Sequence, residues 1–262
     1  MNTIIAPTDF TAVSLNAVHY AADMAAALKL NLLVLHATEA EILSFSTDDF
    51  NETETSIDRK FIRLKDKLVK RTGNTIKIRF KAVPGIIENE VIKICDRRQP
   101  FAVVMATHGA NAKTQFFMES ITIHLSRHLN YPVIIVPPDT QYRPVQKIVL
   151  ATDLKDIDKL PAEKITTAVN AFNARLHILH INNDKQYDES AAEAITLKAR
   201  LEHLNPVFHF LKCRNVQRGI LMYAENNEVD MIITFPKKHL FFHKSETKQV
   251  IFNSPVTVMT IR

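Results

Sequence analysis

The sequence predicts an α/β protein with two similar domains, each built around a doubly wound, parallel, five-stranded sheet. The first observation is that short runs of Val, Ile and Leu alternate with longer segments whose apolar residues recur at helical spacing. The second is that these runs are apolar at almost every position, which is typical of parallel strands covered by helices on both faces. The third is that the pattern occurs twice, because TIIAPTDF at 3–10 is matched by KIVLATDL at 147–154.

The first repeat alternates strand and helix along its whole length. The segment 11–28 carries apolar side chains that fall on one face of a helix, whereas 75–82 alternates apolar and polar residues as a strand does. The acidic stretch TDDFNETE at 47–54 is predicted to be a polar loop before a helix. We expect strands at 3–6, 32–36, 75–82, 101–105 and 133–136, and helices at 11–28, 54–71, 86–96 and 113–129.

The second repeat follows the same order with fewer residues. NLLVLH at 31–36 is matched by RLHILH at 175–180, and NYPVIIV at 130–136 is matched by NSPVTVM at 253–259. Prolines between the repeats disfavour helix and indicate a stiff linker. We therefore place domain one at 1–138, the linker at 139–144 and domain two at 145–262. Strands of the second domain are expected near 147–151, 175–181, 207–212, 230–235 and 256–260.

Length and composition limit the class of protein. A chain of 262 residues suggests about two domains, and 46% hydrophobic with 23% charged residues is ordinary for a packed protein, which excludes a mostly disordered chain. No run approaches the roughly 20 apolar residues that span a bilayer, and no signal peptide is evident, so we expect a cytoplasmic protein. Two cysteines cannot build a disulfide framework, and a net charge of +5 suits an anionic ligand without requiring one.

The predicted sheets also indicate where a ligand would bind. In open parallel sheets, ligands sit beyond the carboxyl ends of the strands at the point where the strand order reverses. In the first domain the first and fourth strands flank that crevice. Their ends carry Pro7-Thr8-Asp9 and Ala106-Thr107-His108-Gly109, which are therefore the segments to examine for chemistry.

Several segments resemble the universal stress protein (UspA-like) family. They are PTDFTAVSLNAV after the first strand, LLVLHA at the second, a Pro-Gly turn at 84–85, and MATHGANAKTQFFMESITIHLSRHLNYPVIIV at 105–136. The resemblance covers essentially the whole chain, strongly in 1–138 and weakly in 145–262, and the tandem arrangement is similar to that of two-domain members. It implies the strand order 3-2-1-4-5 in each domain.

The resemblance also implies a nucleotide site in the first domain. ATP-binding members carry Gly-x2-Gly-x9-Gly-Ser/Thr after the fourth strand, and that pattern falls here on Ala106, Gly109, Glu119 and Ser120. The aspartate that contacts the nucleotide in such members corresponds to Asp9. The neighbouring contact positions correspond to Pro7, Thr8, Ala37, Met105 and Ile121. A Mg²⁺ ion would enter this site only together with ATP.

Glu119 is the main departure from the family pattern. Glycines let backbone amides approach phosphate oxygens, and a helix N-terminus favours anions, so Gly109 and Ser120 keep part of a phosphate site. Glu119 instead places a carboxylate where the family has glycine. At about 4 Å, two like unit charges repel by roughly 1–4 kcal/mol at dielectrics between water and protein surface. We therefore expect weakened or absent ATP binding in domain one, and no such site in domain two, where FPKKHL replaces the loop at 235–240.

Other candidate residues each have two interpretations. Asp9 and the equivalent Asp153 serve either a ligand or the cap of the following helix. His36 and His180 occupy equivalent strand ends, which favours inherited structure over a functional role. His239 and His243, four residues apart among lysines, could hold a metal ion, but no third ligand is evident and we expect no metal site. Cys95 and Cys213 are expected in a helix and a strand as small buried hydrophobes.

The leading hypothesis is a non-catalytic binding protein of the stress response. The sequence contains no GxxxxGK[ST] loop, no GxGxxG after a strand and no GxSxG elbow, and no nucleophile and base converge. The first alternative keeps ATP in domain one, with slow hydrolysis, and the second is an interaction module without ligand. The partners considered are an adenine nucleotide and an unidentified protein, and we expect neither nucleic acid nor a membrane.

The family resemblance finally implies how the two repeats meet. In this family the fifth strands often pair, which would place Val133–Val136 beside Val256–Thr260 in an intramolecular pseudo-dimer. An edge strand needs cover, and a partner edge supplies it. A homodimer of the whole chain stays open at this point.

Overall fold

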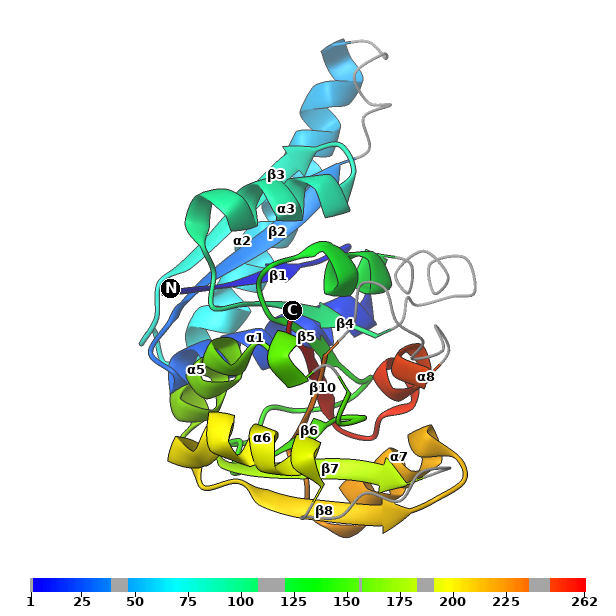
Figure 1. Cartoon of the computed structure of the whole chain (residues 1–262). Coiled ribbons are helices and arrows are strands. Elements are labelled where there is room, and N and C mark those ends of the chain that lie inside the picture. The colour runs from blue at the N-terminus through cyan, green and yellow to red at the C-terminus, as the bar shows by residue number, and fades with distance from the viewer. Residues whose placement is uncertain (1, 39–46, 108–120, 156, 183–190, 236–245) are drawn as a thin grey trace. The chain divides into compact units, whose positions relative to one another are not determined.

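The structure is a computed structural model that describes residues 2–38, 47–107, 121–155, 157–182, 191–235 and 246–262 (Figure 1). The chain divides into two compact units. Unit one comprises Met1–Leu125 and Pro138–Tyr142, and unit two comprises Ser126–Pro137 and Arg143–Arg262. The division falls within a helix at 121–128. The fifth strand of the first repeat therefore belongs to the second unit.

Unit one alternates strands and helices in the predicted order. Its elements are β1 (Thr3–Pro7), α1 (Ala12–Ala27), β2 (Asn31–Thr38), α2 (Thr47–Arg71), β3 (Ile78–Pro84), α3 (Ile87–Arg98) and β4 (Ala102–Ala106). The strands lie in the order β3-β2-β1-β4 and all pair in parallel. This is the doubly wound arrangement, and it places the carboxyl ends of β1 and β4 side by side.

Helices cover both faces of this sheet. Right-handed crossovers put α1 and α2 on one face and α3 on the other, and α1 contacts α2, β1 and β4. The central strands β1 and β4 are buried along nearly their whole length. Burial on both faces explains why these strands read as continuous apolar runs, and it fixes the position of the crevice at their ends.

Unit two repeats the architecture. Its elements are β5 (Val133–Val136), β6 (Lys147–Ala151), η2 (Ile157–Lys159), α5 (Ala162–Phe172), β7 (Arg175–Asn182), α6 (Ala192–Leu201), η3 (Glu202–Leu204), β8 (Val207–Lys212), α7 (Val216–Asn226), β9 (Met231–Thr234), α8 (Glu246–Asn253) and β10 (Thr257–Thr260). The strand order is β5-β10-β9-β6-β7-β8. Among the described strands of this unit, the pairs are parallel except β5 with β10.

The antiparallel β5–β10 pair confirms the prediction that the fifth strands of the two repeats meet. Val133 lies opposite Thr260, Ile134 opposite Met259, and Ile135 opposite Val258. Both strands are buried throughout. The pairing covers an edge that each repeat would otherwise leave open, as expected for strands that end a sheet.

Three local predictions differ from the structure. The acidic stretch at 47–54 is helical, because α2 begins at Thr47, and acidic residues suit the positive end of the helix dipole. The third strand begins at Ile78, three residues later than expected. Cys213 follows the last residue of β8 and is half-buried, while Cys95 lies buried in α3 as expected. Burial raises the pKa of the Cys95 thiol to about 12, so this cysteine is unreactive.

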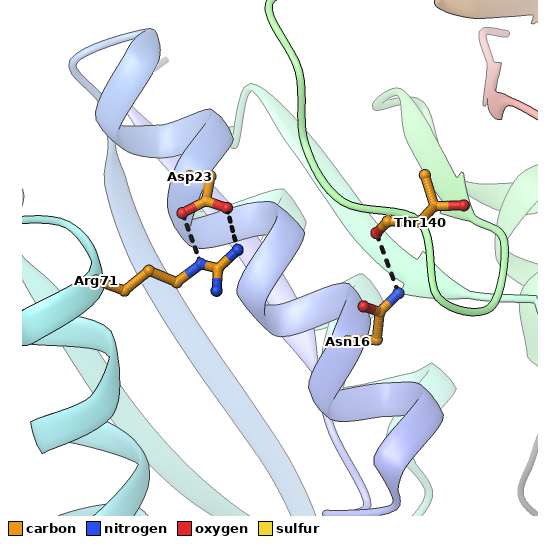
Figure 2. A network of polar contacts seen from close by, with 4 residues as sticks. All are labelled: Asn16, Asp23, Arg71 and Thr140. Carbon is orange, nitrogen blue, oxygen red and sulfur yellow. Dashed lines mark hydrogen bonds and ion pairs between the residues drawn. The ribbon is translucent and has the colours of Figure 1, made fainter.

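The segment 139–142, which begins the predicted linker at 139–144, lies against α1. The Asn16 side-chain amide donates a hydrogen bond to the Thr140 carbonyl oxygen over 3.2 Å (Figure 2). The Tyr20 and Tyr142 rings meet edge to face with centroids 5.3 Å apart. On the same helix, Asp23 forms a two-pronged ion pair with Arg71 of α2, at 2.6 and 2.7 Å. The first part of the predicted linker, up to Tyr142, is thus held on unit one by specific contacts.

Candidate functional site

A tight turn connects β1 to α1 at the predicted crevice. The Thr8 N–H donates to the Leu35 carbonyl of β2 over 2.8 Å, which extends the sheet by one residue. Phe10 then adopts a left-handed conformation with φ 64°, and its N–H donates to the Thr8 hydroxyl over 3.0 Å. Thr11 is the N-cap of α1, and its side-chain oxygen accepts from the Ser14 N–H. The turn is therefore closed by its own hydroxyl groups.

The Asp9 carboxylate takes part in this turn. Its Oδ1 accepts hydrogen bonds from the Thr11 N–H at 3.0 Å and from the Thr11 hydroxyl at 2.6 Å. Burial works to raise the pKa of Asp9, but the Ser14 and Thr11 hydroxyls and the backbone N–H groups of Thr11 and Asp9 outweigh it and hold the pKa below its usual range. Asp9 is therefore ionised at neutral pH and supports the start of the helix.

His36 fixes the turn from the neighbouring strand. Its Nδ1 lies 2.8 Å from the Thr8 carbonyl oxygen, and because a carbonyl can only accept, Nδ1 carries the hydrogen. Burial lowers the pKa of His36, a shift only partly offset by this hydrogen bond. The centroid of the Phe10 ring lies 4.7 Å from that of the imidazole and 5.4 Å from that of Phe61. The Phe61 and Phe80 ring centroids are 5.2 Å apart. Sequence reasoning did not connect these aromatic residues, which are spread over three elements.

The second repeat builds the same turn. The Thr152 N–H donates to the Leu179 carbonyl over 3.0 Å, and the Leu154 N–H donates to the Thr152 hydroxyl over 3.1 Å. Leu154 has φ 57°, and Asp153 Oδ1 accepts from the Lys155 N–H at 3.0 Å. His180 Nδ1 lies 3.0 Å from the Thr152 carbonyl oxygen and donates to it, as His36 does to Thr8.

The other candidate residues that the structure describes are mostly buried. Pro7, Thr8, Met105, Ala106 and Ile121 are buried, whereas Ala37 is half-buried at the end of β2. The Thr122 hydroxyl donates to the Ala106 carbonyl oxygen over 3.4 Å, which ties the helix at 121–128 to the end of β4. Gly109, Glu119 and Ser120 lie outside the described residues, so the structure brings together the strand-end half of the predicted site.

The described part of the chain holds no cluster of three or more His, Cys, Asp or Glu side chains that could bind a metal ion. His239 and His243 lie outside it. Within the same described ranges, no helix is both long enough and apolar enough to cross a bilayer.

Comparison with known proteins agrees with the architecture. Residues 1–137 match the model of the universal stress protein family. The chain belongs to the universal stress protein family. No curated protein matches it. Among solved structures, a universal stress protein from Archaeoglobus fulgidus DSM 4304 has a TM-score of 0.75 at 18% identity, over 100% of this chain and 98% of that one.

Two further solved structures are similar to this universal stress protein in fold. A putative universal stress protein from Pseudomonas aeruginosa UCBPP-PA14 has a TM-score of 0.61 at 12% identity, over 100% of this chain and 93% of that one. The cytoplasmic domain of a prokaryotic cation chloride cotransporter has a TM-score of 0.52 at 10% identity, over 99% of this chain and 94% of that one. At such identities the likeness concerns the fold, which serves proteins of different function.

Proposed function

We propose that this universal stress protein is a non-catalytic binding protein of the cytoplasm, in which the ATP site of the first repeat is weakened or lost. The protein would respond to stress through its ligand state or its protein partners. Binding without turnover fits the described residues of the site, in which Asp9 and His36 are hydrogen-bonded to backbone groups of the turn itself.

The observation that carries this proposal is the identity of the turns in the two repeats. Asp9 and Asp153 accept the same backbone hydrogen bond, and His36 and His180 donate to equivalent carbonyl groups. The second repeat has no glycine after Gly219, so it builds this turn without a phosphate loop. The Thr-Asp turn is thus explained by folding alone, and Asp9 by itself gives no argument for a bound nucleotide.

A second candidate function is ATP binding in the first repeat, with slow hydrolysis. It is favoured by Gly109 and Ser120, which survive at family positions, and by the small side chain of Ala106 at the end of β4. The two functions differ in the effect of Glu119. If its carboxylate faces the phosphates, the native protein binds ATP poorly, and if it points elsewhere, ATP binding survives.

The experiment is a calorimetric titration of ATP into the native protein and into Glu119→Gly at matched ionic strength. We expect weak or no binding by the native protein and a gain of about 1–4 kcal/mol in the variant, because a like charge next to the phosphates is removed. A gain that shrinks in high salt would identify the cause as electrostatic. A gain independent of salt would identify backbone freedom at the new glycine.

Two matched variants in the Glu119→Gly background control for the site. Asp9→Asn should weaken the recovered ATP binding, whereas Asp153→Asn changes the equivalent turn of the second repeat and should leave it unchanged. Phosphate release from ATP should stay at the uncatalysed rate in every variant. Tight ATP binding by the native protein that is unaffected by Glu119→Gly would contradict the proposal and support the second candidate.

A further inference from the structure

Strand β8 forms the outer edge of the sheet in unit two. It pairs in parallel with β7 from Val207 to Lys212, and the described residues include no strand on its other side (Figure 1). An edge strand presents a row of backbone N–H and C=O groups that can pair with another chain. Proteins commonly block such edges with charged side chains, proline or a short strand length.

The edge of unit two has less of this protection than the equivalent edge of unit one. In unit one the edge strand β3 carries the exposed charged residues Arg79 and Lys81 and ends in Pro84. In β8 the five residues before Lys212 carry no acidic residue, lysine or arginine. Val207 is 48% exposed and Leu211 is 37% exposed. The three residues between them are half-buried, and Lys212 at the end of the strand is exposed. The outer edge of unit two is therefore apolar up to Lys212 and accessible at its two ends.

The sequence of β8 is symmetric about its centre. The residues VFHFL at 207–211 have His209 in the middle, a phenylalanine on each side and an aliphatic residue at each end. Two antiparallel copies centred on His209 would place Phe208 opposite Phe210 of the second copy, and Val207 opposite its Leu211. The Phe208 and Phe210 rings already lie on one face, with planes within 14° of each other. Aromatic and aliphatic cross-strand pairs of this kind stabilise antiparallel sheets.

The protein already uses antiparallel edge pairing. Strands β5 and β10, which end the two repeats, pair antiparallel over Val133–Ile135 and Val258–Thr260 inside unit two. The remaining strand pairs described in this unit are parallel. Equivalent strands of the two repeats thus pair edge to edge and antiparallel, as if related by a two-fold axis. Two copies of β8 would pair in the same way.

We propose that β8 is a self-association edge, through which two copies of this chain form an antiparallel β8–β8 pair centred on His209. The occupant is a second copy because residues 207–211 are complementary to themselves, and the strand's one Lys, Arg, Asp or Glu is Lys212 at its end. A pair of five-residue strands buries less than the roughly 800 Å² per partner of a standard interface. The dimer is therefore weak and depends on protein concentration.

The first test measures the sedimentation velocity of the full chain over a range of concentrations. The native protein should show a monomer–dimer equilibrium, and Leu211→Lys should raise its dissociation constant by more than about tenfold, because an ammonium group would replace the aliphatic side chain opposite Val207 of the second copy. Ile195→Lys is the matched control, since Ile195 is exposed on helix α6 of the same unit. A native protein that stays monomeric at all concentrations, or a dimer weakened equally by both variants, overturns the proposal.

The second test reads the register of the pair. In a Cys213→Ser background, His209→Cys should form a disulfide-linked dimer under mild oxidation, because a residue on the two-fold axis faces its own copy at a Cβ separation of roughly 4.5–5.5 Å. Leu211→Cys alone should not, because it faces Val207. Circular dichroism of each variant checks that it is folded. Equal cross-linking of both variants contradicts the register, and cross-linking of neither contradicts the pairing.

Discussion

His36 and His180 show how a single side chain can fix the loop between a strand and a helix. Each imidazole sits on the second strand of its repeat and donates from Nδ1 to the carbonyl of the threonine that follows the first strand. Burial lowers the pKa of both groups, so both are neutral around pH 7. The same hydrogen bond occurs in both repeats, although the residues around it differ. This fits a structural role for the two histidines, as their equivalent positions in the sequence suggested.

Removal of this donor should destabilise the fold. We expect His180→Leu to lower the free energy of unfolding by about 1–3 kcal/mol, because the Thr152 carbonyl loses its partner in a largely buried place. His180→Asn is the matched control, since its side-chain amide keeps a donor near the Nδ1 position and should cost less. Urea denaturation measures both variants. Equal losses would show that packing, and not the hydrogen bond, explains the role of His180.

At the scale of elements, β7 and β8 are joined by a pair of histidines that sequence reasoning missed. His177 Nδ1 lies 2.9 Å from His209 Nε2, and the two ring planes are parallel within 5°. The ring centroids are 5.1 Å apart. This separation is close to the length of the nitrogen–nitrogen contact plus the distance from each ring centre to its nitrogen. The contact therefore lies close to the plane of both rings. Such a bond needs one donor and one acceptor, so only one of the two facing nitrogens can carry a proton.

The surroundings of the pair also oppose protonation. Burial lowers the pKa of His177, and the positive charges of His209, Lys147 and Arg175 lower it further. Burial and Lys147 lower the pKa of His209, whose ring also packs 5.1 Å from Tyr223 of α7. Lys147 lies in β6 and Arg175 at the start of β7. The charged side chains that act on the histidine pair from these two strands are therefore both cationic.

Acid should therefore loosen this part of the sheet. The pKa of each imidazole is below the value of 6.5 expected in the unfolded chain, so the unfolded chain binds more protons below that pH. Stability should rise with pH through this window and fall as the pH drops from about 7 to about 5. We expect His177→Gln with His209→Gln to flatten the pH dependence of the free energy of unfolding, measured by urea denaturation at several pH values.

The control for this prediction is His203→Gln. His203 is exposed and bonds to the Thr166 hydroxyl at 2.9 Å, outside the pair. It should leave the acid slope nearly unchanged. A double variant with the same acid slope as the native protein would place the pH dependence in other groups.

Buried strands were predictable from the sequence because continuous apolar runs have few alternative structures. The positions of β5, β6 and β8 match the predicted ranges. Acidic residues at 47–54 were assigned to a loop because polar residues carry no hydrophobic period, yet their charges suit the start of a helix. The His177–His209 bond depends on the register of two strands 32 residues apart, which apolar patterning does not specify.

Over the whole molecule, the repeat seen in the sequence and the compact units of the structure do not coincide. The repeat predicts a boundary after 138, but β5 packs in unit two and 138–142 packs in unit one. The physical reason is the β5–β10 pair, which gives β5 its antiparallel partner within unit two. Local patterning finds strands, whereas only the pairing of edges decides in which unit a strand is buried.

Lys164 of α5 holds together parts of unit two that are distant in the chain. Its ammonium group donates to the Asn130 carbonyl oxygen at 2.7 Å and to the Arg262 carbonyl oxygen. The Arg262 side chain in turn donates to the Arg127 carbonyl oxygen. Burial lowers the pKa of Lys164, and the Arg262 charge lowers it further. One side chain thus joins the second repeat to the segment that leads into β5.

Loss of this ammonium group should loosen β5 from the rest of unit two. We expect Lys164→Met to lower the free energy of unfolding by about 1–3 kcal/mol, because the side chain keeps its length but two carbonyl groups lose a charged donor. The exposed Lys198→Met on α6 is the matched control and should change stability by less than about 0.5 kcal/mol. Hydrogen exchange provides the specific readout: amides of Val133–Val136 and Thr257–Thr260 should exchange faster in Lys164→Met, since the β5–β10 pair depends on the neighbouring segment being held. A uniform increase in exchange over both units, without a larger effect on β5 and β10, would show that Lys164 contributes to general stability and does not anchor this strand pair.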